Sequence, residues 1–292
     1  MSGITTRSIA ANGLRFAIDE AGSGEAVALC LHGFPEARIS WRHQLPYLAA
    51  QGWHAVAPDL RGYGETSRPR AQRAYRLEHL VADAGALFDA LGARRRLLVA
   101  HDWGGLIAWT FAMQRGRPLD GLAILNVPHP AVFRTVLRRS WRQRARSWYV
   151  GAFQVPALPE ALLSARDAAA IPRVFTATAA VPDAFPPEVL ERYRANAAQP
   201  GAMRAMIDYY RANLGTLTRE GPSPMIDVPT LMVWGERDTA LGLELTEGYD
   251  AYVRDFTLRR LPGAAHWVQQ EAPDAVNAAL GEWLASRGLA AP

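Results

Sequence analysis

Short apolar segments alternate with longer segments of helical periodicity along most of the chain. Near the amino terminus, residues 5–10 and 14–18 are separated by Asn12-Gly13, a pair typical of a tight hairpin turn. The apolar runs that follow are short and separated by helical patterns, which indicates buried parallel strands joined by helices. The pattern predicts an α/β fold with a mostly parallel, doubly wound sheet. The further predicted strands are residues 26–31, 54–57, 97–100, 122–125, 230–234 and 256–261.

This alternation stops between residues 126 and 224. The stretch is rich in Arg, Ala, aromatic residues and Pro, which favours a helical insertion that covers the carboxyl edge of the sheet as a cap. The expected cap helices are residues 131–148, 187–197 and 203–214. The expected domains are a core of residues 1–129, a cap of residues 130–224 inserted after the sixth strand, and a second part of the core in residues 225–292.

The charge of the chain does not indicate a nucleic-acid partner. The net charge is +4, but all 32 basic residues are arginines and they are scattered among 28 acidic residues without a recognition motif. Six arginines lie in the predicted helix of residues 131–148. We expect them to form a solvated outer face of the cap, with a membrane-surface or partner site as the alternative.

The sequence predicts neither a membrane span nor a secretion signal. No apolar stretch approaches the roughly 18 residues that a transmembrane helix needs. Residues 1–20 lack a basic start followed by an apolar block, so a cytoplasmic location is expected. Cys30 is the only cysteine and lies in an apolar run, which predicts a buried thiol without a redox or metal role.

An aspartate stands at the turn between a predicted strand and a predicted helix. Asp102 is surrounded by Ala100, Gly104 and Gly105, the small residues that a nucleophile elbow needs. A carboxylate at such an elbow attacks carbon and forms an alkyl ester, although an aspartate is also common at ordinary helix starts. The backbone N–H groups of Phe34 and Trp103 are the expected oxyanion donors.

An acid and a base follow late strands in the order that this architecture uses. Asp238 ends one late strand and His266 follows the last strand, so the order along the chain is nucleophile, acid, base. Asp238 is expected to orient His266, which activates water; Glu236 is the competing acid. The histidines lack metal-ligand spacing and no Gly-rich phosphate loop follows a strand, so neither a metal nor an organic cofactor is expected.

With these residues, the chain resembles the epoxide hydrolases of the α/β-hydrolase fold over nearly its whole length. The resemblance implies that fold, with a helical lid after the sixth strand. It also implies a small-molecule epoxide as substrate, a covalent ester at Asp102 and a vicinal diol as product. The segments that carry the resemblance are residues 32–36, 40–44, 59–64, 101–105 and 266–271.

The same resemblance assigns two cap tyrosines to the epoxide oxygen. Tyr149 and Tyr210 match the two family positions whose hydroxyls polarise that oxygen, and Tyr209 is a rival for the second. Aromatic residues in a cap also often only pack, so each assignment has a structural alternative. The expected aromatic walls of the substrate site are Phe34, Trp103, Phe153 and Trp267.

Two other functions stay open from the sequence. A haloalkane dehalogenase uses the same aspartate, and Trp103 is one candidate donor to a leaving halide. A non-catalytic binding protein of the same fold is the second alternative, although it has no need for a complete catalytic set. The identity of the epoxide and the oligomeric state, a homodimer included, are not determined by the sequence.

Overall fold

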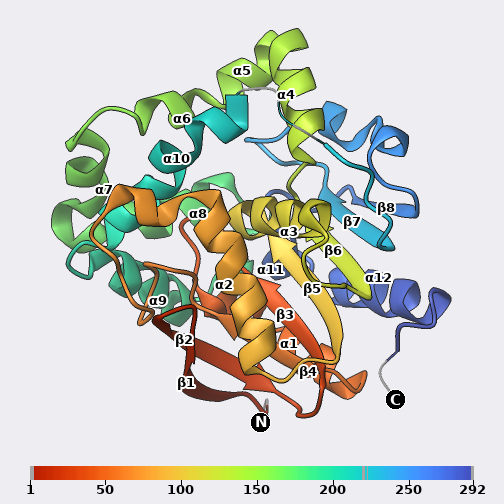
Figure 1. Cartoon of the computed structure of the whole chain (residues 1–292). Helices are drawn as coiled ribbons and strands as arrows, with labels where there is room; N and C mark the ends of the chain where they lie inside the picture. Colours follow the sequence, from red (N-terminus) through yellow and green to blue (C-terminus); the bar gives the residue numbers. More distant parts are fainter. Residues whose placement is uncertain (1–2, 219–220, 222, 291–292) are drawn as a thin grey trace.

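The computed structural model of the chain describes residues 3–218, 221 and 223–290, which contain one eight-stranded sheet (Figure 1). The strands lie in the order β1-β2-β4-β3-β5-β6-β7-β8. The pairs β1–β2 and β2–β4 are antiparallel, and the other neighbours are parallel, which confirms the predicted α/β sheet. The strands are β1 (Thr5–Ala11), β2 (Leu14–Ala21), β3 (Ala26–Leu31), β4 (His54–Pro58), β5 (Arg95–His101), β6 (Gly121–Leu125), β7 (Thr230–Gly235) and β8 (Phe256–Leu261).

The central strands are stable because both faces of the sheet are covered by apolar side chains. Every residue of β4, β6 and β7 is buried. One apolar cluster contains Leu29 with residues of α2 and α3, and a second contains Cys30 with residues of α1 and α12. Neighbouring residues of a strand point to opposite faces, so these two helix pairs cover opposite sides. The core helices are α1 (Gln44–Ala50), α2 (Leu77–Ala90), α3 (Asp102–Gln114), α11 (Val268–Glu271) and α12 (Pro273–Ser286), with short 3₁₀ helices η1 (Arg38–Trp41), η2 (Gln72–Tyr75), η4 (Leu243–Thr246) and η5 (Tyr249–Ala251).

Between β6 and β7 the chain forms a helical cap, which occupies the upper and left parts of Figure 1. Cap residues bind the loops that follow core strands: the Tyr209 hydroxyl donates to the Arg61 carbonyl, and the Leu77 amide donates to Asn213. The cap therefore lies over the carboxyl edge of the sheet. Its helices are α4 (Pro130–Arg139), α5 (Trp141–Arg146), α6 (Trp148–Ala152), α7 (Leu158–Ala168), α8 (Ala170–Thr178), η3 (Pro182–Ala184), α9 (Pro187–Ala198) and α10 (Ala202–Thr218).

The single helix predicted over residues 131–148 is wrong, because the chain breaks twice in this stretch. Ser140 has extended backbone angles (φ −103°, ψ 110°), and its hydroxyl accepts a hydrogen bond from the Gln143 amide at 3.1 Å. Serine offers the backbone this alternative to a continuous helix, so α4 ends and α5 begins there. A second break at Ser147 separates α5 from α6.

Two cap helices, α7 and α8, were not predicted from the sequence. The predicted cap helices of residues 187–197 and 203–214 are present as α9 and α10, with α10 extending to Thr218. No helix among the described residues is long and apolar enough to cross a membrane.

Candidate active site

Asp102 lies at a tight turn between β5 and α3, in a left-handed backbone conformation (φ 48°) that residues other than glycine rarely adopt. A Cβ atom added to Gly104 would lie 2.2 Å from the carbonyl oxygen of Leu31, and one added to Gly105 would lie 2.0 Å from Val127. Only glycine permits these approaches, so both glycines are required by the turn. The strained turn presents the carboxylate of Asp102 at the edge of the sheet.

One oxygen of this carboxylate is held by the loop that follows β3. The Phe34 amide donates to Oδ1 of Asp102 at 2.7 Å. The loop approaches closely because residue 33 has no side chain: a Cβ atom on Gly33 would lie 2.3 Å from Asp102. Oδ1 is therefore bound by the Phe34 amide, whereas Oδ2 faces His266. The second expected oxyanion donor, the amide of Trp103, stays a prediction.

His266 and Asp238 form a buried pair beside the same carboxylate. Nδ1 of His266 lies 2.7 Å from Oδ2 of Asp238, and Nε2 of His266 lies 3.8 Å from Oδ2 of Asp102. Asn126 donates to Asp238 at 2.9 Å, and the Leu241 amide donates at 2.9 Å. The acidic partner of the histidine is thus Asp238, with Nδ1–H as donor and Nε2 directed at Asp102.

The charges around His266 stabilise its protonated form. Burial alone would lower the pKa of His266, but the charge and hydrogen bond of Asp238, together with the charge of Asp102, raise it to about 9. Burial raises the pKa of Asp238, but the His266 charge and the hydrogen bonds to the carboxylate together outweigh burial. The pKa of Asp238 is therefore below its normal value. The resting site at neutral pH therefore contains an imidazolium between two carboxylates.

This pKa shift predicts a pH dependence of stability. An unfolded histidine has a pKa near 6.5, so between pH 6.5 and about 9 the folded protein keeps a proton that the unfolded chain releases. The stabilisation is complete below pH 6.5 and is lost as pH rises through about 9, by about 3 kcal/mol in total. Urea unfolding of the wild type and of His266→Gln measures this loss. Between pH 6.5 and about 9, the free energy of unfolding of the wild type should fall by this amount relative to that of His266→Gln. A constant difference over this range would contradict the shift.

An apolar cavity of about 70 Å³ opens directly onto Asp102. It lies between the elbow and the cap, and two of its lining residues are Tyr149 of α6 and Tyr210 of α10, whose ring centroids are 6.0 Å apart. The carboxylate and both tyrosines therefore share one small chamber. The other lining residues are Trp103, Leu106, Val127, Pro128, Pro130, Phe133, Val150, Leu217 and Leu241.

Tyr209 and Tyr210 are adjacent in α10 but have different surroundings. The hydroxyl of Tyr209 donates to the Arg61 carbonyl at 2.8 Å, and its ring packs on Tyr63. Tyr210 instead lines the cavity with Asp102. Burial, followed by the charge of Asp102, raises the pKa values of Tyr149 and Tyr210 well above normal, so both hydroxyls keep their protons and can donate hydrogen bonds.

Of the four expected aromatic walls, Trp103 lines the cavity. Phe34 and Phe153 pack against each other with ring centroids 5.4 Å apart, and both contact Tyr210 edge-on. Trp267 packs on the His266 ring, and its indole N–H donates to Thr178 at 2.9 Å. These three aromatic residues therefore support the tyrosine and the histidine around the chamber.

The sequence reasoning missed a second buried ion pair behind the site. Glu36 and His101 are fully buried, with Nδ1 of His101 2.7 Å from Oε2 of Glu36. Nε2 of His101 donates to the carbonyl of His266 at 2.9 Å, and the Gly33 amide donates to Glu36 at 2.9 Å. Burial raises the pKa of Glu36, but the charge and hydrogen bond of His101, the charge of His32 and the Gly33 amide together lower it below its normal value. The pair thus connects the loops that carry the oxyanion donor, the nucleophile and the base.

A signal for this pair was present in the sequence. Glu36 lies two residues after Phe34, and His101 directly precedes Asp102. Both residues therefore belong to motifs that we assigned to the site, but spacing alone did not indicate that they contact each other.

Comparisons with known proteins agree with this geometry. Residues 27–273 match the alpha/beta hydrolase fold family. The chain is 38% identical to epoxide hydrolase 4 of Mus musculus over 279 residues, which cover 94% of this chain and 77% of the relative. The chain belongs to the epoxide hydrolase family of the α/β-hydrolase fold. The resemblance that the sequence motifs indicated is therefore confirmed.

Other members of the epoxide hydrolase family match over almost their full length. Epoxide hydrolase A of Mycobacterium tuberculosis is 32% identical over 323 aligned residues, covering 97% of this chain and 98% of that protein. The crystal structure of a Bacillus megaterium epoxide hydrolase in complex with an inhibitor superimposes with a TM-score of 0.88 at 28% identity, covering 96% of this chain and all of that one. The cap and the core are thus both part of the likeness.

Proposed function

We propose that the protein hydrolyses an apolar epoxide to a vicinal diol through a covalent ester at Asp102. The observation that carries the proposal is the chamber in which the Asp102 carboxylate, Tyr149 and Tyr210 meet, with His266 Nε2 3.8 Å from the same carboxylate. A nucleophile, two proton-bearing donors and a base are the groups that the two steps of this reaction need.

In the first step, Oδ2 of Asp102 attacks an epoxide carbon, and the bond between that carbon and the ring oxygen breaks. The ring oxygen leaves as an alkoxide, which Tyr149 and Tyr210 stabilise by hydrogen bonds while it takes up a proton. Oδ2 is the attacking atom because Oδ1 accepts the Phe34 amide. The ester carbonyl is then Oδ1, which already lies at the oxyanion donor.

Ester formation prepares the base for the second step. The negative charge of Asp102 helps to raise the pKa of His266, and the ester has no such charge. The pKa of His266 therefore falls when the ester forms, and the ring releases a proton, which balances the proton taken up by the alkoxide. His266 becomes a base only after the nucleophile has reacted.

In the second step, His266 takes a proton from water, and the hydroxide oxygen attacks the ester carbonyl carbon. The oxyanion forms on Oδ1, where the Phe34 amide, together with the expected donor Trp103, stabilises it. The bond between this carbon and Oδ2 breaks, His266 returns the proton to Oδ2, and the diol leaves. The water oxygen stays in Asp102.

The lining of the chamber favours an apolar substrate. Apart from Asp102 and the polar atoms of three aromatic residues, its side chains are aliphatic, proline or phenylalanine. A charged substrate would lose its hydration there without a partner, at a cost of several kcal/mol. The volume of about 70 Å³ further favours an epoxide with small substituents.

Replacing either cap tyrosine with phenylalanine should slow ring opening. Removing one donor from a developing oxyanion costs about 3 kcal/mol, so Tyr149→Phe and Tyr210→Phe should each lower kcat/KM for an aryl-substituted or alkyl-substituted epoxide about a hundredfold. The matched control is Tyr209→Phe, because Tyr209 donates to the Arg61 carbonyl and does not line the chamber. Diol formation is measured by chromatography and ester formation by stopped flow.

Two results would contradict the proposal. Equal kcat/KM values for Tyr210→Phe and Tyr209→Phe would show that the hydroxyl of Tyr210 does not assist ring opening. Release of halide from a chlorinated or brominated alkane, without diol formation from any epoxide, would instead identify a haloalkane dehalogenase. The absence of turnover on both substrate classes would favour a binding protein.

A further inference from the structure

The cap contains a long stretch of positive charge without compensating acids. Residues 121–159 include six arginines and no aspartate or glutamate. The whole chain carries +4, so the rest of it is net negative by two charges. Arg134 is buried, and the other five arginines are exposed on α4 and α5: they are Arg138, Arg139, Arg142, Arg144 and Arg146.

Large apolar side chains are exposed along the same part of the cap. Trp141 is 67% exposed and Trp148 is 70% exposed, and three aliphatic residues of α7 and the loop before it are also exposed. Among the described residues, five of the seven exposed large hydrophobic side chains lie between residues 141 and 162. We name the surface formed by the five arginines and these side chains the cap face; its apolar members are Trp141, Trp148, Val155, Leu158 and Leu162.

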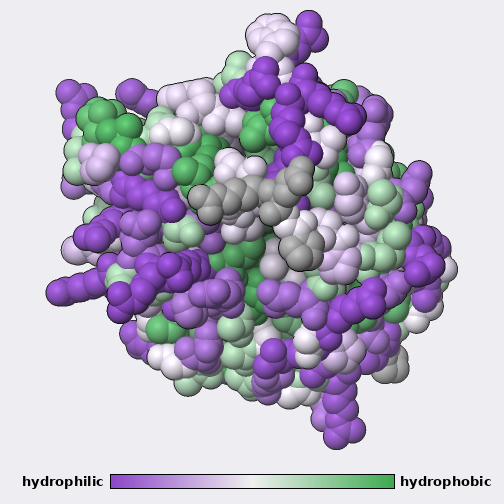
Figure 2. Space-filling model, turned by 45° about the horizontal axis from the view of Figure 1, so that its top comes forward, coloured by the Kyte–Doolittle hydropathy of each residue, from purple (hydrophilic) through white to green (hydrophobic). Residues whose placement is uncertain are grey.

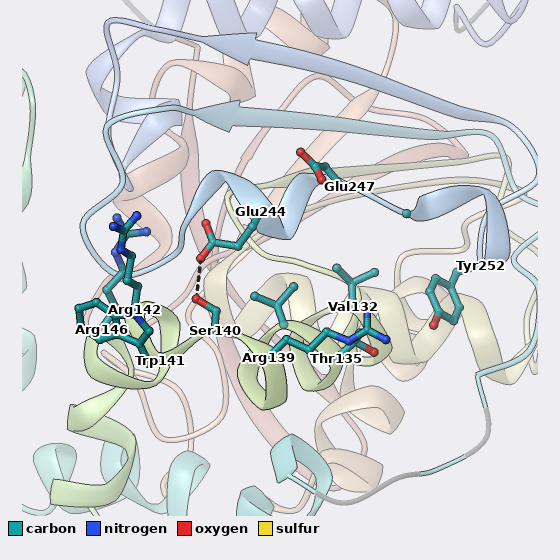
Figure 3. A pocket seen from close by; sticks show the side chains of 12 residues that line it. Val132, Thr135, Arg139, Ser140, Trp141, Arg142, Arg146, Glu244, Glu247 and Tyr252 are labelled. Atoms are coloured by element: carbon teal, nitrogen blue, oxygen red, sulfur yellow. Dashed lines mark hydrogen bonds between the residues drawn. The ribbon is translucent and has the colours of Figure 1, made fainter.

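The cap face projects from the body of the molecule. Helices α5, α6 and α7 form its upper and left margin in Figure 1, and hydrophobic and hydrophilic side chains lie side by side on the surface that Figure 2 turns forward. An open groove of about 860 Å³ separates α4 and α5 from η4. In Figure 3, Trp141, Arg142 and Arg146 extend from α5 at one end of this groove.

Three arginines of the cap face are available to an external anion. No ion pair within 4 Å between a described carboxylate and Arg139, Arg142 or Arg144 is present. Two acids, Glu244 and Glu247, line the groove together with Arg139, Arg142 and Arg146. The guanidinium of Arg142 lies 5.8 Å from the ring centre of Trp141, so one positive charge and one exposed indole are presented together.

We propose that the cap face binds the surface of an anionic lipid bilayer. Arginines pair with lipid phosphates, and tryptophan is suited to the boundary between headgroups and acyl chains. A nucleic acid or acidic protein would satisfy the arginines, but the projecting tryptophan and leucine side chains require an apolar phase as well. A bilayer supplies both in one plane.

Surface binding would bring the chamber close to a source of apolar molecules. Tyr149 follows Trp148 directly in α6, so the same short helix belongs to the cap face and to the chamber. The binding proposal does not depend on the reaction proposed above, because vesicle binding and diol formation are measured separately.

The test is flotation of the full-length protein with vesicles. Binding is compared between vesicles of equal parts phosphatidylglycerol and phosphatidylcholine and vesicles of phosphatidylcholine alone. The wild type should bind the anionic vesicles, and added salt should weaken the binding. The triple variant Arg142→Gln, Arg144→Gln, Arg146→Gln should lower the partition coefficient roughly a hundredfold, and Trp141→Ser with Trp148→Ser should lower it further.

The matched control removes three positive charges from the surface of the α/β core domain, outside the cap. Arg15, Arg94 and Arg259 are exposed on or near the sheet, and their replacement by Gln should leave vesicle binding within a few fold of the wild type. Circular dichroism and diol formation without vesicles should be unchanged in the cap arginine variant. No binding of the wild type to anionic vesicles would overturn the proposal, as would equal losses in the two triple variants. Binding to RNA or heparin without binding to vesicles would also overturn it.

Discussion

His266→Gln is expected to stop the reaction after the ester has formed. In the variant, Asp102 can still attack, because the cap tyrosines stabilise the alkoxide and solvent can supply its proton. Hydrolysis of the ester needs a base, and loss of a general base slows a step by about 10²–10⁴-fold. The variant should therefore accumulate enzyme whose mass exceeds that of the free protein by the mass of one epoxide. Intact-protein mass spectrometry measures this, and peptide mapping should locate the adduct at Asp102.

The control for this experiment is His79→Gln, since His79 is exposed on α2 and lies outside the site. It should turn over normally and show no adduct. If His266→Gln binds the epoxide, shown by protection against thermal unfolding, but forms no adduct, the covalent scheme fails. Rapid diol production by His266→Gln would show that another group activates water.

Asp102→Asn is expected to abolish turnover, with a loss on the order of 10⁶-fold, because the neutral amide is not a nucleophile and no other carboxylate lines the chamber among the described residues. Unlike His266→Gln, it should form no adduct. The measurement is diol formation over hours at high enzyme concentration, together with mass spectrometry of the protein.

The matched control is Glu236→Gln, which makes the same change near the end of β7 without touching His266. It should keep wild-type activity. A single turnover of the wild type in water enriched with heavy oxygen should place the label in Asp102 and leave the diol unlabelled. Label in the diol, or appreciable diol formation by Asp102→Asn, would mean that water attacks the epoxide directly.

The grouping of the proposed nucleophile, acid and base was predictable because each follows a strand within a short local pattern. Asp102 is surrounded by small residues, and Asp238 and His266 end later strands in the expected order. The resemblance to the epoxide hydrolases also implied that two cap tyrosines lie near the proposed nucleophile. It did not separate Tyr209 from Tyr210, since adjacent residues on a helix point about 100° apart and only packing decides which one faces the chamber.

The cap was the least predictable part of the fold. Its composition indicated helices, but the Ser140 hydroxyl accepts a hydrogen bond from the Gln143 amide and divides the arginine-rich helix, and such competition depends on local geometry. Cap helices are held mainly by contacts with each other and with the core, so their limits depend on tertiary packing.

The sequence by itself determined the order of the strands along the chain, the position of the helical cap between two strands and the chemical type of each proposed catalytic group, because these depend on local periodicity and on residues close together in the chain. The tertiary structure alone decided which carboxylate oxygen is free, which of two adjacent tyrosines lines the chamber, and that Glu36 and His101 join three loops. It also brought the charge of Asp102 within 3.8 Å of His266. Distances across the fold set hydrogen bonds and pKa values, and a linear sequence does not contain those distances.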